Sequence, residues 1–193
     1  MSMSAELTTG RPGRRAATVS RLAAAAVEEI RAEGYDGLTV RNVARRAGVA
    51  PATAYIHFES KDHLVAEAFW RLLEALPEVE STPAGREAKP AARVAAAIAD
   101  VAQLVTDEPA VAAAATTAML ANEPGVAQLR RRIGAAFRDR FARALGDAAD
   151  PAGVDTLDLA FSGALIRGGV GEMPYADLVP VMTAVAKVVT GRR

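Results

Sequence analysis

Residues 34–64 read GYDGLTVRNVARRAGVAPATAYIHFESKDHL, and this stretch decides the fold of the N-terminal part of the chain. Gly48 stands between two short segments whose apolar residues recur at helical spacing, and Val49 follows it. A steep crossing of two short helices needs a residue that accepts a left-handed backbone, then an apolar residue that packs beneath both helices. Pro51 is tolerated in the first turn of a helix. We therefore predict a helix-turn-helix motif over about residues 38–57.

The sequence on both sides of this motif continues the helical pattern. A first helix is expected from Thr18 to Gly34, and Ser60 is placed to cap a fourth helix that ends near Pro77. Alanine is abundant and aromatic residues make up 5% of the chain, which favours closely packed helices over a sheet. We predict an all-α protein of about nine helices. In it, a three-helix N-terminal domain is joined by the fourth helix to a larger helical domain.

Composition divides the chain into four predicted parts. Residues 1–17 mix Ser, Thr, Gly and Pro with arginine, which is typical of a flexible basic arm. Residues 18–77 hold the helix-turn-helix domain. Residues 78–90 contain two prolines, a glycine and several charges and are expected to form a linker or loop. Residues 91–193 hold the second helical domain.

Charge is balanced over the whole chain but not along it. The formal net charge is zero, yet between Arg11 and His57 eight arginines outnumber four acidic residues. Such an excess is typical of a surface that binds a polyanion, and also of a solvated charged face. The absence of cysteine excludes disulfides and thiolate chemistry. No apolar run is long enough to cross a bilayer and no cleavable signal is evident, so we expect a cytoplasmic protein without membrane contact.

The residue types at 34–49, 53–58 and 60–64 resemble the N-terminal domain of TetR-family repressors, whereas the second half resembles that family only in its helix layout. The resemblance implies a homodimer that binds a palindromic operator in double-stranded DNA and is released by an unknown small-molecule effector. The second domain would then bind the ligand and form the dimer. A repressor is the family default. An activator, or a helical interaction protein without specific DNA binding, remains an alternative.

The third helix is expected in the major groove, with its N-terminal residues facing the base edges. The resemblance implies that Arg41 reaches a guanine and Arg45 a phosphate, while Thr53 suits contact with a thymine methyl group. Tyr55 either contacts DNA or packs against the first helix, and His57 is either a backbone contact or an ordinary surface residue. The basic arm either enters the minor groove or adds non-specific attraction. The predicted DNA-binding residues are Thr39, Arg41, Arg45, Pro51, Ala52, Thr53, Tyr55, His57 and Lys61.

The family also implies a ligand cavity within the middle helices. Charged residues there fall mainly on the opposite helix faces, so the effector is expected to be apolar with few polar handles. The same residues would otherwise be ordinary core. The candidate lining residues are Trp70, Leu73, Val101, Leu104, Val105, Thr116, Met119, Leu120, Phe137 and Phe141.

In the resembled family, the last two helices pair with those of a second chain as a four-helix bundle. Here these helices are expected over residues 154–166 and 176–189, each with an apolar stripe. The stripes are either a dimer interface or core within one chain. The predicted interface residues are Leu157, Phe161, Leu165, Leu178, Val181, Met182, Val185 and Val189.

An enzyme is not expected from this sequence. It has no Ser-His-Asp pattern at a recognised spacing. With two histidines and no cysteine, it offers no metal-ligand cluster. We therefore predict no catalytic residues, no metal site and no cofactor.

Overall fold

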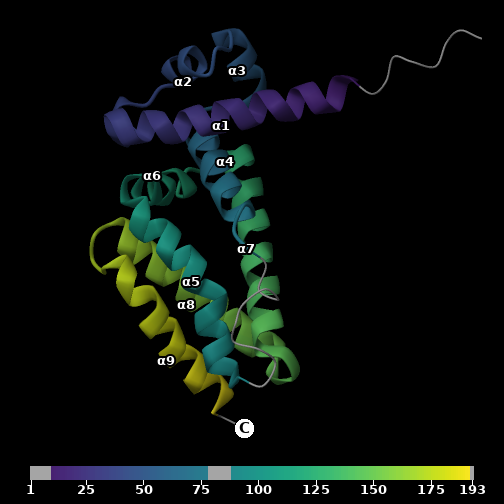
Figure 1. Cartoon of the computed structure of the whole chain (residues 1–193), viewed down its shortest axis with the longest axis vertical. Coiled ribbons are helices and arrows are strands. Elements are labelled where there is room, and N and C mark those ends of the chain that lie inside the picture. The colour runs from purple at the N-terminus through teal and green to yellow at the C-terminus, as the bar shows by residue number, and fades with distance from the viewer. Residues whose placement is uncertain (1–9, 78–87, 192–193) are drawn as a thin grey trace, which may run out of the picture.

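The computed structural model describes residues 10–77 and 88–191, and every regular element in these residues is a helix. The all-α prediction is therefore confirmed. Helices α1 to α3 form one end of the molecule, α4 leads away from them, and α5 to α9 form the larger bundle (Figure 1). The helices are α1 (Gly10–Gly37), α2 (Val40–Arg46), α3 (Pro51–His57), α4 (Lys61–Glu74), α5 (Pro90–Asp107), α6 (Pro109–Met119), α7 (Pro124–Leu145), α8 (Pro151–Gly169) and α9 (Leu178–Thr190), with short 3-10 turns η2 (Gly146–Ala148) and η3 (Tyr175–Asp177).

The turn between α2 and α3 has the backbone that the sequence predicts. Gly48 has a φ of 63°, in the left-handed region, and Val49 is buried beneath the two helices. Thr39 caps α2 because its Oγ1 accepts a hydrogen bond from the backbone N–H of Asn42 at 3.1 Å. Ala50, by contrast, gives α3 no side-chain cap. The geometry of the motif thus depends on its glycine and on buried packing.

The first helix is longer than predicted. It begins at Gly10, so the prediction of a flexible arm is wrong for residues 10–17, while residues 1–9 lie outside the described residues. Arginine and alanine, which dominate positions 14–17, are strong helix formers, and extending an existing helix costs far less than starting one. Gly34 has a φ of 69° and interrupts α1 at the predicted position.

The predicted linker is only partly covered by the structure. Residues 78–87 lie outside the described residues, and α5 begins at Pro90. The α8 helix begins at Pro151, earlier than predicted, because Asp150 caps it by accepting a hydrogen bond from the Gly153 N–H at 2.6 Å. Across the described ranges, no helix combines the length and the apolar character needed to span a bilayer.

The larger bundle is built around α5, which packs against α7 and α9, while α8 packs against α6, α7 and α9. Its centre holds three phenylalanines. The ring centroids of Phe137 and Phe161 are 4.6 Å apart, and those of Phe141 and Phe161 are 5.7 Å apart. Phe141 and Phe161 are almost completely buried, so this cluster is the aromatic centre of the second domain.

The predicted dimer stripes lie largely on the inward faces of α8 and α9. Leu157, Phe161, Leu178 and Met182 are at most 1% exposed and pack inside a single chain. Their assignment to a dimer surface is wrong, because a side chain with no exposed area has none to bury against a partner. The remaining predicted interface residues are partly buried or exposed, namely Leu165, Val181, Val185 and Val189.

A second apolar surface, which includes the predicted interface residue Val181, lies on the outward faces of the same two helices. We call it the outer stripe. It consists of Leu159, Ile166, Val170, Val181 and Val188, which range from 37% to 76% exposed. Gly163 lies on α8 among these residues, and a Cβ added to it would meet no atom within 4 Å.

Candidate DNA-binding surface and ligand pocket

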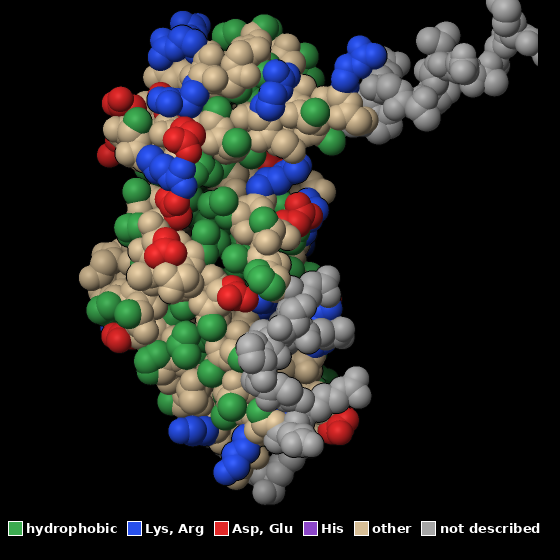
Figure 2. Space-filling view, viewed as in Figure 1, with side chains coloured by type: hydrophobic (Ala, Val, Ile, Leu, Met, Phe, Trp, Pro, Cys, Tyr) green, Lys and Arg blue, Asp and Glu red, His purple; other side chains and the backbone are tan. Residues whose placement is uncertain are grey.

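The outward faces of α2 and α3 carry the first candidate site. Arg41, Arg45, Pro51 and Ala52 are exposed, and Tyr55 is 56% exposed, so its side chain is not packed into the core. Figure 2 shows several lysine and arginine side chains at this end of the molecule. Within the described residues, neither Arg41 nor Arg45 makes an ion pair. Both guanidinium groups are therefore available for a phosphate or a base edge.

Sequence reasoning missed one residue of this surface. Ile56 is 74% exposed at the tip of α3. The signal was present, because Ile56 follows Ala52 by four residues and Thr53 by three, and these spacings place residues on one face of a helix. Ala54 and Phe58, which lie on the opposite face, are buried and anchor α3 to the domain.

Three predicted DNA contacts are less exposed. Thr53 and His57 are partly buried, and the Nδ1 of His57 is buried with no hydrogen-bond partner in the described residues. The Lys61 ammonium donates to the Tyr35 carbonyl oxygen at 3.3 Å and lies 3.9 Å from the centroid of the Tyr35 ring. The Tyr35 hydroxyl donates in turn to Asp62. The pKa of Tyr35 is raised, mainly because the side chain is partly buried and also because of this hydrogen bond. Lys61 is thus held in place at the start of α4.

The third arginine of α2 has a different environment. Arg46 Nε donates to Glu29 Oε2 at 2.7 Å, and Glu29 is 4% exposed. This ion pair joins α2 to α1. It explains why a charged residue lies in the core of the N-terminal domain, since a buried carboxylate needs a cation and hydrogen bonds.

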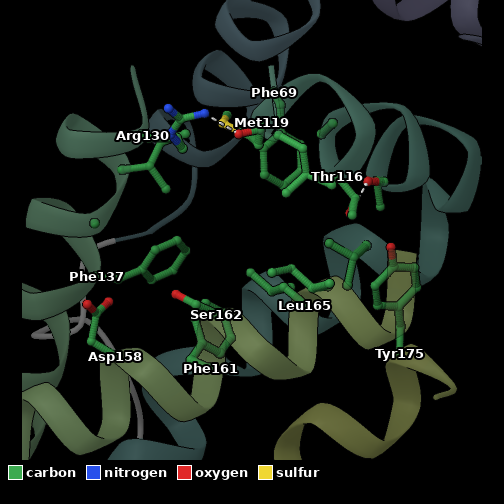
Figure 3. A pocket seen from close by; sticks show the side chains of 17 residues that line it. Phe69, Thr116, Met119, Arg130, Phe137, Asp158, Phe161, Ser162, Leu165 and Tyr175 are labelled. Atoms are coloured by element: carbon green, nitrogen blue, oxygen red, sulfur yellow. Dashed lines mark hydrogen bonds between the residues drawn. The ribbon is translucent and has the colours of Figure 1, made fainter. Parts of the chain in front are cut away.

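The second candidate site is a partly open pocket of about 250 Å³ lined by residues from α4 to α8 and η3. Its wall is mostly apolar, with side chains from five helices pointing toward one another (Figure 3). The lining residues are Phe69, Val105, Ala112, Ala115, Thr116, Met119, Leu120, Arg130, Ile133, Gly134, Phe137, Asp158, Phe161, Ser162, Leu165, Ile166 and Tyr175.

The predicted pocket residues fall into three groups in the structure. Five line this cavity, namely Val105, Thr116, Met119, Leu120 and Phe137. Trp70, Leu73 and Val101 instead line a second hollow of about 230 Å³, which shares Phe137 with the first. Leu104 lines neither cavity, and Phe141 is 0% exposed within the aromatic centre.

Sequence reasoning missed the α8 residues of the pocket. Asp158, Phe161, Ser162, Leu165 and Ile166 line it at spacings of three and four residues. The sequence analysis assigns Phe161 and Leu165 to a dimer stripe and names no residue of this helix for the pocket. The spacing of these five residues predicts that they share one face of a helix. It does not predict that this face lines the cavity.

Helix α6 connects the pocket to the domain that carries the DNA-binding surface. It lines the pocket and also packs against α1 and α4 of the N-terminal domain. Glu108, which directly precedes α6, is hydrogen-bonded to Arg31 of α1, with Nε and Oε2 3.0 Å apart. This contact lowers the pKa of Glu108. Ser60, at the start of α4, donates to Glu123, just before α7. The pocket walls are thus in direct contact with the elements that hold α2 and α3.

Comparisons with known proteins agree with this architecture. Residues 13–68 match the family model described as bacterial regulatory proteins, tetR family. An uncharacterised HTH-type transcriptional regulator of Mycobacterium tuberculosis is 41% identical over 167 residues, which cover 86% of this chain and 76% of that protein. A TetR transcriptional regulator from Rhodococcus sp. RHA1 has a TM-score of 0.75 at 18% identity, over 91% of this chain and 97% of that one. Thermus thermophilus FadR, a TetR-family transcriptional repressor solved in complex with lauroyl-CoA, has a TM-score of 0.68 at 17% identity. The match covers 89% of this chain and 92% of that one.

The fold and the exposed face of α2 and α3 define a helix-turn-helix regulator of transcription with an all-helical second domain. The chain belongs to the TetR family of transcriptional regulators.

Proposed function

We propose that this chain is a repressor that binds a two-fold symmetric operator as a homodimer and leaves it when a small, mainly apolar molecule fills the pocket. The observation that carries this proposal is the position of α6. Ala112, Ala115, Thr116 and Met119 line the pocket, while the helix also packs against α1 and α4. A ligand that favours one position of α6 therefore shifts the equilibrium between positions of the DNA-reading helices.

The Arg31–Glu108 contact supports the same coupling. It lies at the N-terminal end of α6, so a displacement of that end acts on α1 directly. Both side chains are partly exposed, and an ion pair of this kind contributes little to stability. Its importance is in fixing the position of α6 relative to α1.

The outer stripe is the surface that we propose for the dimer. It is apolar, has members on both α8 and α9, and is exposed within a single chain. Large exposed apolar side chains grouped on one helix face are typical of interfaces between subunits. The open space over Gly163 allows a partner helix to approach closely. A dimer is also what a short reading helix needs, because two heads on two half-sites together supply the affinity that one lacks.

The proposal is tested by selecting bound sequences from a random DNA pool with the purified protein, followed by a salt titration on the enriched sequence. We expect a two-fold symmetric site with a steep salt dependence. The Arg41→Met variant should select a consensus that is relaxed at one base pair of each half-site, because one base contact is lost. If no sequence is enriched, specific DNA binding is contradicted and the alternative of a helical interaction protein is favoured.

A further inference from the structure

The pocket contains a carboxylate without a hydrogen-bond partner. Asp158 of α8 lines the cavity, is partly buried, and accepts no hydrogen bond from any described residue. Figure 3 shows its side chain on the pocket side of α8, beside Phe137 and Ser162. The rings of Phe137 and Phe161, whose centroids are 4.6 Å apart, form the neighbouring wall. A carboxylate in apolar and aromatic surroundings is costly unless a cation or a donor accompanies it.

Two other polar groups of the pocket, Thr116 and Arg130, are already engaged. The Thr116 hydroxyl donates to the Ala112 carbonyl at 3.0 Å. Arg130 donates to the carbonyl oxygens of Met119 and Ala121, at 2.5 Å and 2.8 Å, on the side of the pocket away from Asp158 (Figure 3). Neither group therefore neutralises Asp158.

Arg138 is the cation whose charge acts on the Asp158 carboxylate. It too has another partner. Its Nη1 donates to Asp155, one turn before Asp158 on α8. Burial raises the pKa of Asp158, and the attraction of Arg138 offsets this only in part. Any molecule that covers Asp158 removes water from the carboxylate, and only a positively charged or donating group on that molecule replaces the lost solvation.

The opposite end of the pocket is closed by Tyr175. Its ring lies against Gly168, ten residues beyond Asp158 on α8, which corresponds to a rise of about 15 Å along the helix. The Tyr175 hydroxyl is buried, and the Thr116 side chain is the polar group beside it. Phe161 and Leu165 lie between the two ends (Figure 3). The cavity is thus elongated, with a carboxylate at one end, apolar walls and a phenol at the other.

We propose that this pocket selects an elongated, apolar amine, whose protonated nitrogen binds Asp158 against the rings of Phe137 and Phe161. The inference rests on the proposed function, since it names the chemical class of the effector. An ammonium group satisfies the Asp158 carboxylate by a charge-assisted hydrogen bond and gains further from the aromatic faces. A carboxylate ligand would instead meet Asp158 with a like charge.

The test measures binding of three matched probes to the purified protein by calorimetry at neutral pH. The probes are 4-phenylbutylamine, 4-phenylbutanol and 4-phenylbutyrate, which share one apolar body and differ in the terminal group. The amine should bind at least about tenfold more tightly than the alcohol, as expected for a hydrogen bond to a charged group. Asp158→Asn should remove about that factor for the amine and leave the alcohol unchanged.

Asp107→Asn is the control, because it removes an exposed carboxylate at the end of α5 that does not line the pocket and does not act on the charge of Asp158. It should leave the affinity of the amine unchanged. The proposal is overturned if the amine fails to bind, if the acid binds as tightly as the amine, or if the two variants lose equal affinity. Unchanged alcohol binding shows that the Asp158→Asn pocket is intact. Since this readout requires no DNA, failure here is distinct from failure of operator binding.

Discussion

Arg45 and Arg46 are adjacent in α2, yet their environments predict opposite consequences of mutation. Arg46 pairs with the buried Glu29 at 2.7 Å, whereas Arg45 is exposed and makes no ion pair within the described residues. Arg46→Met leaves the Glu29 carboxylate buried without its cation. Arg45→Met removes a solvated charge from the proposed DNA-binding face.

The size of the first effect follows from burial. Removing one partner of a fully buried ion pair costs about 3–5 kcal/mol, because the other charge stays uncompensated. The Arg46 side chain is 42% exposed, so water reaches part of this site. We therefore expect Arg46→Met to lower the free energy of unfolding by about 1–3 kcal/mol. Arg45→Met should change it by less than about 0.5 kcal/mol.

Urea unfolding followed by circular dichroism measures both values. Adding Glu29→Gln to Arg46→Met should restore part of the lost stability, because the uncompensated charge is then removed. On DNA, Arg45→Met should lower the salt slope of binding by about one unit, as expected for a lost phosphate contact. Equal stability of the Arg45→Met and Arg46→Met variants would refute this reasoning, and so would the absence of any recovery in the double variant.

Three further predictions concern the turn, the outer stripe and the α1–α6 contact. Gly48→Ala should destabilise the protein by about 1–2 kcal/mol in thermal unfolding because φ there is 63°, whereas Gly134→Ala, in an open helical position, should not destabilise it. Leu159→Glu should shift the protein toward monomer in sedimentation velocity, and the exposed Ala135→Glu on α7 should not; an unchanged dimer would count against the outer stripe. The lowered pKa of Glu108 means that its contribution to stability is present above the ordinary glutamate value of about 4.3 and is lost as pH falls through the lowered pKa. The difference in unfolding free energy between wild type and Glu108→Gln should therefore be constant near neutral pH and shrink in acid, and a constant difference at all pH values would contradict the assignment.

The N-terminal domain was largely predictable because its signals are local. Gly48 requires a backbone that few other residues accept, and Thr39 and Ser60 cap the helices that follow them. Such requirements depend on a residue and its near neighbours. The start of α1 was missed for a related reason, since a polar composition at residues 10–17 does not prevent an existing helix from extending over it.

The sequence alone predicts that the chain is all-helical, where most helices begin and end, and that two short helices present Arg41 and Arg45 on α2 and Tyr55 on α3. The tertiary structure decided which face of each later helix turns inward. On α8, apolar residues lie on two faces, so helical periodicity does not distinguish Leu157 from Leu159 as the buried residue. Only the packing of α8 against α6, α7 and α9 buries the first and exposes the second. The same packing turns Asp158 toward the pocket. The periodicity of the sequence predicts which residues share a helix face, but not which part of the protein that face contacts.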